Sequence, residues 1–154
     1  MKSSYSGTVK ARLEEELKEA KFTLPRYLVV AIVSTAIGTA VLWCFTVLVG
    51  LYYLVSGCLG AFFTILSAFV FNELWTFSHR RAARLFTIEL AKRFARFILS
   101  KTAGFLICIG ILAFFTQVVG WHYLISNIFA IGASFAWNYT VSSLWVWARK
   151  ERRG

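Results

Sequence analysis

Residues 27–49 read YLVVAIVSTAIGTAVLWCFTVLV and contain no charged side chain. An α-helix needs about 20 mostly apolar residues to cross a hydrocarbon core about 30 Å thick, and this run is long enough. Two more runs without Lys, Arg, Asp or Glu cover residues 51–72 and 102–147, and the second could cross twice. The runs predict four transmembrane helices, at about 27–49, 52–77, 98–119 and 122–147.

The composition of the whole chain supports membrane insertion. Of its 154 residues 58% are hydrophobic, and the mean hydropathy is +0.66, whereas soluble domains contain about 45–50% apolar residues. Strands of a membrane barrel would alternate in polarity over about 10 residues, but these runs are unbroken apolar blocks. We therefore predict an all-α integral membrane fold in a multi-pass protein of the cell (cytoplasmic) membrane.

The basic residues are placed asymmetrically along the chain. The net charge is +10, and all but one of the 17 Lys and Arg residues lie before the first run, in the central loop 78–97, or after residue 148. Basic loops stay in the cytoplasm, so both termini and the central loop are expected there. Anionic lipid headgroups explain these flanking clusters, and nucleic acid is not expected as a partner.

Three segments follow from this pattern. Residues 1–25 predict a cytoplasmic amphipathic helix on the inner leaflet, because apolar side chains recur at helical spacing among charged ones. Residues 26–149 form the predicted four-helix membrane domain, and residues 150–154 form a basic tail. The apolar face of the first segment comprises Val9, Leu13, Leu17 and Ala20.

An internal repeat is visible at an offset of 70 residues, which aligns 26–80 with 96–150 without a gap. Each half is predicted to be a hairpin that starts and ends in the cytoplasm, so the two hairpins would be parallel repeats about an axis along the membrane normal. Transporters often use such repeats, with the substrate path at their interface; the alternative is a duplicated hairpin kept for its packing. Matched residues include Arg26 with Arg96, Gly50 with Gly120, Tyr53 with Tyr123, and Trp75 with Trp145.

Small and polar residues share one face of the second helix in each predicted hairpin. Small residues let membrane helices approach closely, and amides hydrogen-bond between them. Asn72 and Asn138 are the strongest candidates for a further role, because a buried amide needs a partner. On the first helix, Ser34-xxx-Gly38 predicts a close-packing face for a homo-oligomer. The two polar faces comprise Gly57, Thr64, Ala68 and Asn72, and Asn127, Ser134, Asn138 and Ser142.

Several motifs resemble those of the GtrA-like family of four-span membrane proteins, over about residues 25–149. They are Arg-Tyr-Leu-Val-Val at 26–30, Gly-Leu-Tyr-Tyr-Leu at 50–54, Phe-Asn-Glu-Leu-Trp-Thr-Phe at 71–77, Trp-Asn-Tyr at 137–139 and Ser-Leu-Trp-Val-Trp at 143–147. The resemblance implies movement of polyprenyl-phosphate-linked sugars across the membrane for cell-surface polysaccharides or glycoconjugates. Some family members look more like anchors for a glycosyltransferase. Arg is common in the family at the position of Glu73.

Candidate ligands for a lipid phosphate are the cations at the cytoplasmic ends of the helices. Arg26 and Arg96 start the first and third helices and could flank the phosphate as a clamp of two bidentate donors; the alternative is that they only anchor the topology. Glu73 and Lys101 are the charged residues within or just inside the spans, and each could be functional or could reach to the interface. The full set of predicted phosphate ligands is Arg26, Arg80, Arg96, Lys101 and Arg149.

The polar faces and the tryptophan motifs supply the other candidate substrate contacts. Two aromatic residues lie at the C-terminal end of each predicted hairpin, and we expect all four to form an aromatic belt at the membrane boundary. The candidate contacts are Asn72, Glu73, Trp75, Asn138 and Trp145, and the belt comprises Trp75, Phe77, Trp145 and Trp147.

No catalytic or metal site is expected, and no cofactor. The chain contains no Asp, and its histidines, His79 and His122, would lie on opposite sides of the membrane. The predicted function is ATP-independent translocation (flipping) of a polyprenyl-phosphate-linked sugar. The first alternative is a scaffold that recruits a polyprenyl-phosphate glycosyltransferase. A small multidrug exporter ranks third, because such exporters use a carboxylate in the first span, where this chain has none.

Overall fold

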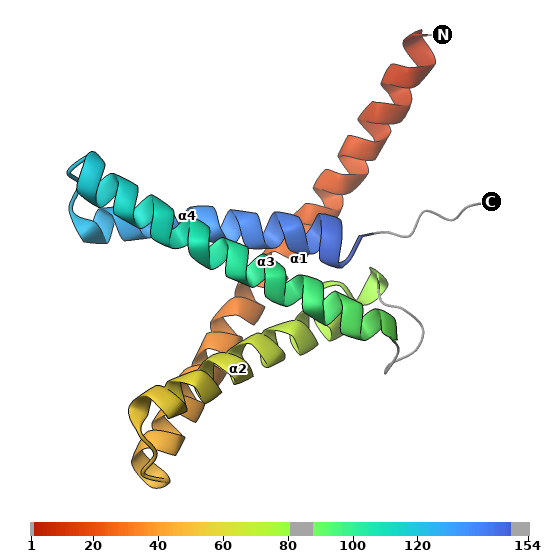
Figure 1. Ribbon diagram of the computed structural model, residues 1–154. Coiled ribbons are helices and arrows are strands. Elements are labelled where there is room, and N and C mark those ends of the chain that lie inside the picture. Colours follow the sequence, from red (N-terminus) through yellow and green to blue (C-terminus); the bar gives the residue numbers. More distant parts are fainter. Residues whose placement is uncertain (1, 81–87, 149–154) are drawn as a thin grey trace. The chain divides into compact units, whose positions relative to one another are not determined.

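The computed structural model describes residues 2–80 and 88–148, and every regular element within these residues is helical (Figure 1). The chain divides into two compact units, Met1–Ser78 and His79–Gly154. Each unit contains two long α-helices, and the short 3₁₀ turn η3 (Ser78–Arg80) lies where the units meet in sequence. The prediction of an all-helical protein with four principal helices is confirmed for the described residues.

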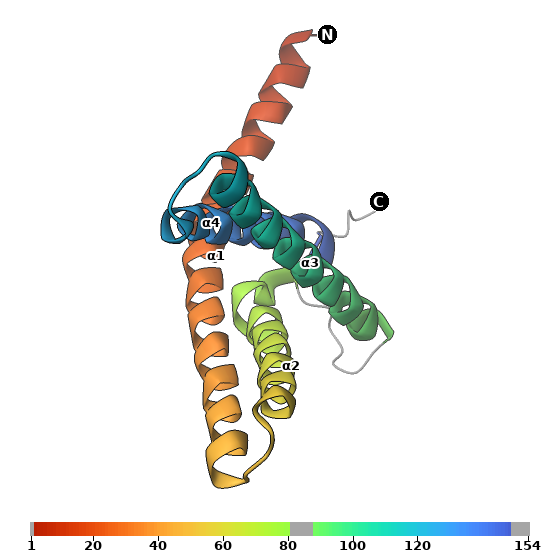
Figure 2. The same ribbon diagram turned by 60° about the vertical axis from the view of Figure 1, so that its left-hand side comes forward.

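The first unit is a helical hairpin. Helix α1 (Lys2–Trp43) continues as the π-helical turn η1 (Cys44–Leu48), and α2 (Tyr53–Phe71) continues as the π-helical turn η2 (Asn72–Thr76). Gly50 turns the chain between them with φ +76°, a conformation that glycine adopts without a Cβ clash. Figures 1 and 2 show α1 and α2 side by side, with the N-terminal part of α1 extending past α2.

Helix α1 runs without interruption through Pro25. The predicted N-terminal segment 1–25 is therefore helical from Lys2, but no break separates it from the first span. Its position on the inner leaflet stays a prediction. Hydropathy marks where a helix enters hydrocarbon, whereas helix formation needs only suitable backbone and side-chain propensities. Charged residues can therefore extend the helix well beyond its apolar run.

The second unit is also a helical hairpin. Helix α3 (Ile88–Ala113) continues as η4 (Phe114–Val118), and α4 (Tyr123–Val141) continues as η5 (Ser142–Val146). Gly120 makes the turn with φ +79°. The Nδ1 atom of His122 caps the start of α4 by accepting a hydrogen bond from the backbone N–H of Leu124 at 3.4 Å.

The element bounds in the two hairpins differ by 70 residues. The turns η1 and η4 start at 44 and 114, α2 and α4 start at 53 and 123, and η2 and η5 start at 72 and 142. These offsets agree with the spacing of the repeat predicted over 26–80 and 96–150. A common orientation of the hairpins in the membrane, and an axis that relates them, stay predictions.

A narrow stripe of mostly small residues on α1 packs inside the first hairpin. Gly38 lies so close to α2 that a Cβ there would meet Thr64 Oγ1 and come within 2.7 Å of the Gly60 carbonyl oxygen. Ser34 is buried as well. The Ser34-xxx-Gly38 motif thus packs within the hairpin, and its prediction as a face for a second copy is wrong because α2 already occupies it. The homo-oligomer stays a prediction without this motif. The stripe comprises Thr23, Tyr27, Val30, Ser34 and Gly38.

Three helical segments in the described residues are long and apolar enough to cross a membrane: Leu17–Leu48, Tyr53–Thr76 and Ile88–Val118. Most of their apolar side chains are exposed on the protein surface, as expected where lipid is the solvent. The fourth segment, 123–146, is less apolar because it carries Ser126, Asn127, Ser134 and Asn138. The protein is therefore a helical membrane protein, and its fourth crossing stays a prediction.

Candidate functional site

The tryptophan motifs at the ends of the two hairpins each point one aromatic side chain inward and leave one exposed. In the first hairpin Phe77 is 0% exposed, and its ring lies edge-on to Tyr27 at 6.4 Å between centroids. In the second, Trp147 is 0% exposed and packs edge-on against Phe97 at 5.6 Å. Trp75 and Trp145 are each 44% exposed. The predicted belt of four is therefore wrong for Phe77 and Trp147, which belong to the hairpin cores.

Arg26 is held by aromatic side chains of the first hairpin. Its guanidinium carbon lies 3.6 Å from the ring centroid of Phe22 and 5.4 Å from that of Trp75. Its Nη1 atom also donates a hydrogen bond to the Trp75 carbonyl oxygen at 3.3 Å. Cation–π contacts and a backbone acceptor together fix this guanidinium. Arg26 thus joins the start of the first span to the end of the second.

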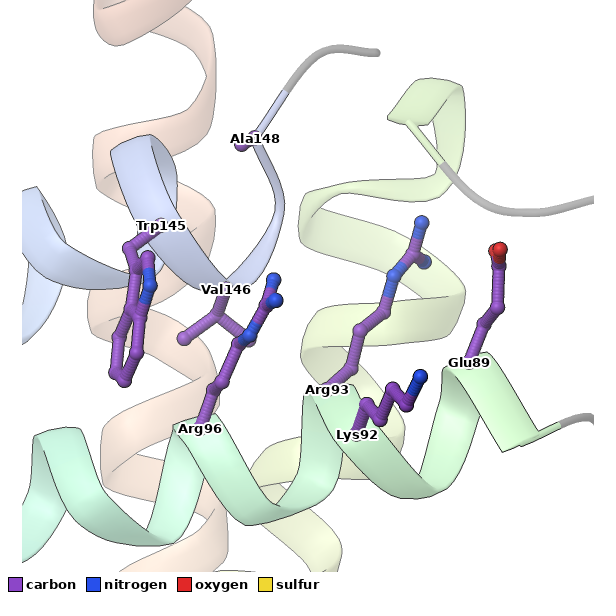
Figure 3. Close-up of a pocket in the computed structure, with 7 residues that line it drawn as sticks. All are labelled: Glu89, Lys92, Arg93, Arg96, Trp145, Val146 and Ala148. Carbon is purple, nitrogen blue, oxygen red and sulfur yellow. The ribbon is translucent and has the colours of Figure 1, made fainter.

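Arg96 occupies the matching position in the second hairpin, but it lines an open pocket (Figure 3). Its guanidinium carbon lies 5.6 Å from the ring centroid of Trp145, which orients it without covering it. The pocket has a volume of about 310 Å³. It is lined by Glu89, Lys92, Arg93 and Arg96 of α3, and by Trp145, Val146 and Ala148 at the end of the second hairpin.

This pocket is strongly basic. Lys92, Arg93 and Arg96 carry three positive charges and Glu89 one negative charge, so the lining has a net charge of +2. Figure 3 shows Arg93 and Arg96 extending upward from α3 and Lys92 extending along the helix toward Glu89, which lies at the end far from Trp145. Such donors suit an anion such as a phosphate or a carboxylate, because guanidinium groups bind the oxygens of both with charge-assisted, bidentate hydrogen bonds.

Arg80 is placed to cap the end of the second hairpin. Its Nη1 atom donates to the Ser143 carbonyl oxygen at 2.6 Å, to Ser143 Oγ at 3.2 Å and to the Trp147 carbonyl oxygen at 3.2 Å. Arg93 in turn donates through Nη2 to the Arg80 carbonyl oxygen at 3.2 Å. The last carbonyls of a helix have no partner within the helix, so Arg80 satisfies groups that would otherwise need water. This geometry gives Arg80 a structural role.

Replacing Arg80 with methionine should lower the free energy of unfolding by about 2–3 kcal/mol, since hydrogen bonds from a charged donor contribute about 1.5–3 kcal/mol. Arg80→Lys should cause a smaller loss, because lysine keeps the positive charge but lacks the planar guanidinium group with its several N–H donors. Unfolding in SDS titrations, followed by circular dichroism, measures this. Arg96→Met serves as the matched control, since Arg96 donates to no carbonyl oxygen within residues 2–80 and 88–148; equal losses in both variants would contradict the capping role.

The remaining predicted ligands have different surroundings. Glu73 and Asn72 are almost fully buried in η2, and among the described residues the Asn72 Oδ1 atom has no hydrogen-bond partner. Lys101 is half-buried, with its Nζ atom 5.1 Å from the Phe97 ring centroid. Glu73 belongs to the first unit and Lys101 to the second, and a functional role for either one stays a prediction. Arg149 lies outside the described residues.

Asn138 takes part in helix packing inside the second hairpin. A Cβ at Gly104 would lie 2.5 Å from Asn138 Nδ2, so the amide lies directly on the α3 backbone. Its Nδ2 atom donates to Ser134 Oγ at 3.4 Å. This bond confirms that Ser134 and Asn138 share one side of α4. The amide therefore packs against the backbone of the other helix of this hairpin.

Three charged residues of the pocket were not predicted from the sequence: Glu89, Lys92 and Arg93. Their basic members were assigned to a cytoplasmic loop at 78–97, whereas α3 already begins at Ile88. A usable signal existed, because positions 89, 92, 93 and 96 follow the spacing of neighbours on one helix face. In the described part of the chain, no three His, Cys, Asp or Glu side chains gather as potential metal ligands.

The fold and this site define a class: helical membrane proteins built from two hairpins, with a basic pocket beside an apolar surface. Residues 26–147 match the family described as GtrA/DPMS, transmembrane domain. The match covers most of the chain, and the protein belongs to this family. A comparison with curated proteins finds no match to the chain.

Proposed function

We propose that this protein moves a polyprenyl-phosphate-linked sugar across the cytoplasmic membrane without ATP and without catalysing a chemical reaction. The family match over residues 26–147 connects the chain to processes that involve polyprenyl-phosphate sugars. The observation that carries the proposal is the basic pocket at the end of the second hairpin, next to helices whose apolar side chains are exposed. The proposal places this pocket at the cytoplasmic surface, as the charge distribution predicts.

The phosphate of the proposed substrate fits the basic pocket, and its prenyl chain fits the exposed apolar surface of the helices. A lipid-linked phosphate carries negative charge that must be neutralised before the headgroup leaves water, because a lone ion in a medium of low dielectric constant is very unfavourable. Lys92, Arg93 and Arg96 supply the neutralising positive charge near the start of α3. The prenyl chain stays in the lipid, where exposed apolar side chains such as Phe105 and Ile128 offer a compatible surface.

Translocation is tested with purified protein in liposomes. A fluorescent polyprenyl-phosphate sugar is placed in both leaflets, and a membrane-impermeant reagent destroys the outer population. The protein should speed up loss of the inner population at least tenfold over protein-free liposomes, with no ATP present. Heat-inactivated protein is the control. If the protein only stimulates a co-reconstituted polyprenyl-phosphate glycosyltransferase and moves no lipid, the flippase proposal fails and the scaffold function takes its place.

A further inference from the structure

The two hairpins differ at the helix face that carries Arg26 and Arg96. An offset of 70 residues matches Glu19 with Glu89, Phe22 with Lys92, Thr23 with Arg93, and Arg26 with Arg96. The second hairpin thus has three cations where the first has one. The sequence difference lies at two positions within one turn of helix.

In the first hairpin the two replacements close the face. The Phe22 ring lies 3.6 Å from the Arg26 guanidinium carbon and covers one side of it. Thr23 is buried, and its hydroxyl donates to the Glu19 carbonyl oxygen at 2.9 Å. Arg26 also donates a hydrogen bond to the Trp75 carbonyl oxygen. The Arg26 side chain is therefore engaged in packing within the first hairpin.

In the second hairpin the same face is open. The side chains of Lys92 and Arg96 are exposed and four residues apart on α3, so they lie on one side of the helix. Among the described residues neither forms an ion pair. Two unpaired cations on one wall of a pocket are favourable only in water or with an anion.

We infer that the second hairpin alone binds the phosphate of the substrate, through Lys92 and Arg96, and that Arg26 is a structural residue. This inference rests on the proposed function for the identity of the lipid. Arg93 adds charge while its Nη2 atom holds the Arg80 carbonyl oxygen. Trp145 acts as a positioning residue, because its ring at 5.6 Å directs the Arg96 guanidinium. The predicted clamp of Arg26 with Arg96 is replaced by a site within one hairpin.

The test measures binding with the full chain in phosphatidylcholine nanodiscs. The probe is a fluorescent short-chain polyprenyl phosphate, and phosphatidylglycerol and inorganic phosphate are separate competitors. Arg96→Gln and Lys92→Gln should each weaken binding about 10- to 100-fold, the range expected for a lost charge-assisted hydrogen bond. Arg96→Lys should fall between wild type and Arg96→Gln. The matched variant Arg26→Gln should keep the Kd within about twofold; if Arg26→Gln does not fold, Arg26→Lys takes its place with the same expectation.

Each outcome decides the inference. Equal losses in the Arg26 and Arg96 variants would restore the shared clamp, and unchanged binding in Arg96→Gln and Lys92→Gln would remove the pocket from the site. Competition by phosphatidylglycerol or inorganic phosphate as strong as by unlabelled polyprenyl phosphate would show a general anion site and overturn the assignment. The proposed function fails separately: wild-type protein that binds the probe but moves no lipid in liposomes leaves the phosphate site in place.

Discussion

Replacing Trp147 with alanine should destabilise the second hairpin by about 3 kcal/mol. This side chain is 0% exposed, and its ring packs edge-on against Phe97. Truncating a buried aromatic side chain to alanine lowers the free energy of unfolding by about 3–5 kcal/mol in soluble proteins. The lower end of that range applies here, because lipid as well as water solvates the unfolded chain. The hydrogen bond from the Trp147 backbone N–H to the Ser142 carbonyl oxygen should survive the change, so the loss reports on packing.

Trp145→Ala is the matched control for this prediction. Trp145 has the same side chain two residues earlier in the chain, but it is 44% exposed. Its removal should lower the free energy of unfolding by less than about 1 kcal/mol, as for most exposed substitutions. SDS titrations of both variants, followed by circular dichroism, give the comparison. Equal losses would show that Trp147 does not hold the hairpin together in the way its burial indicates.

The helices and their turns could be predicted from the sequence, but their full lengths could not. Uncharged runs placed the long helices, and the predicted spans left Gly50 and Gly120 between them, where the structure has positive φ angles. Helix α1 nevertheless starts at Lys2 and α3 at Ile88. Residues 1–25 were predicted to be helical from the spacing of their apolar residues, but hydropathy does not show that this helix continues into the first span without a break, or that α3 begins ten residues before the predicted span.

The candidate site was predicted only in part, because its character depends on contacts between helices. The motif residues Trp75 and Trp145 were found, but a motif does not show which of its aromatic rings is buried. Arg26 and Arg96 look equivalent in the repeat. Their difference comes from Phe22, whose ring covers one guanidinium, and from Lys92, which leaves the other open. Recognising this from sequence requires the helix start at Ile88, which places Lys92 on a helix face.

The close approach of α1 and α2 predicts that Gly38→Ala disrupts the first hairpin. A Cβ at this position would meet Thr64 Oγ1 and come within 2.7 Å of the Gly60 carbonyl oxygen. The Thr64 hydroxyl donates to that same oxygen at 2.9 Å, so rotating Thr64 away would break this bond and would leave the clash with the backbone oxygen in place. The helices would have to separate along the small-residue face where membrane helices pack most closely. Overpacking of this kind typically destabilises by about 1–3 kcal/mol, and we expect about 2 kcal/mol.

Gly57→Ala is the matched control, because in the described part of the chain a Cβ at Gly57 would have nothing within 4 Å apart from its chain neighbours and the adjacent backbone of its own helix. Alanine favours helix over glycine by about 0.8–1 kcal/mol, so this variant should be as stable as wild type or slightly more so. The same substitution should thus act in opposite directions at two glycines of one hairpin. The double variant Gly38→Ala, Thr64→Ala should recover part of the loss by removing Oγ1, but not all of it, since the Gly60 carbonyl oxygen remains. If Gly38→Ala and Gly57→Ala unfold at the same SDS concentration, α1 and α2 do not meet at Gly38 and Gly60.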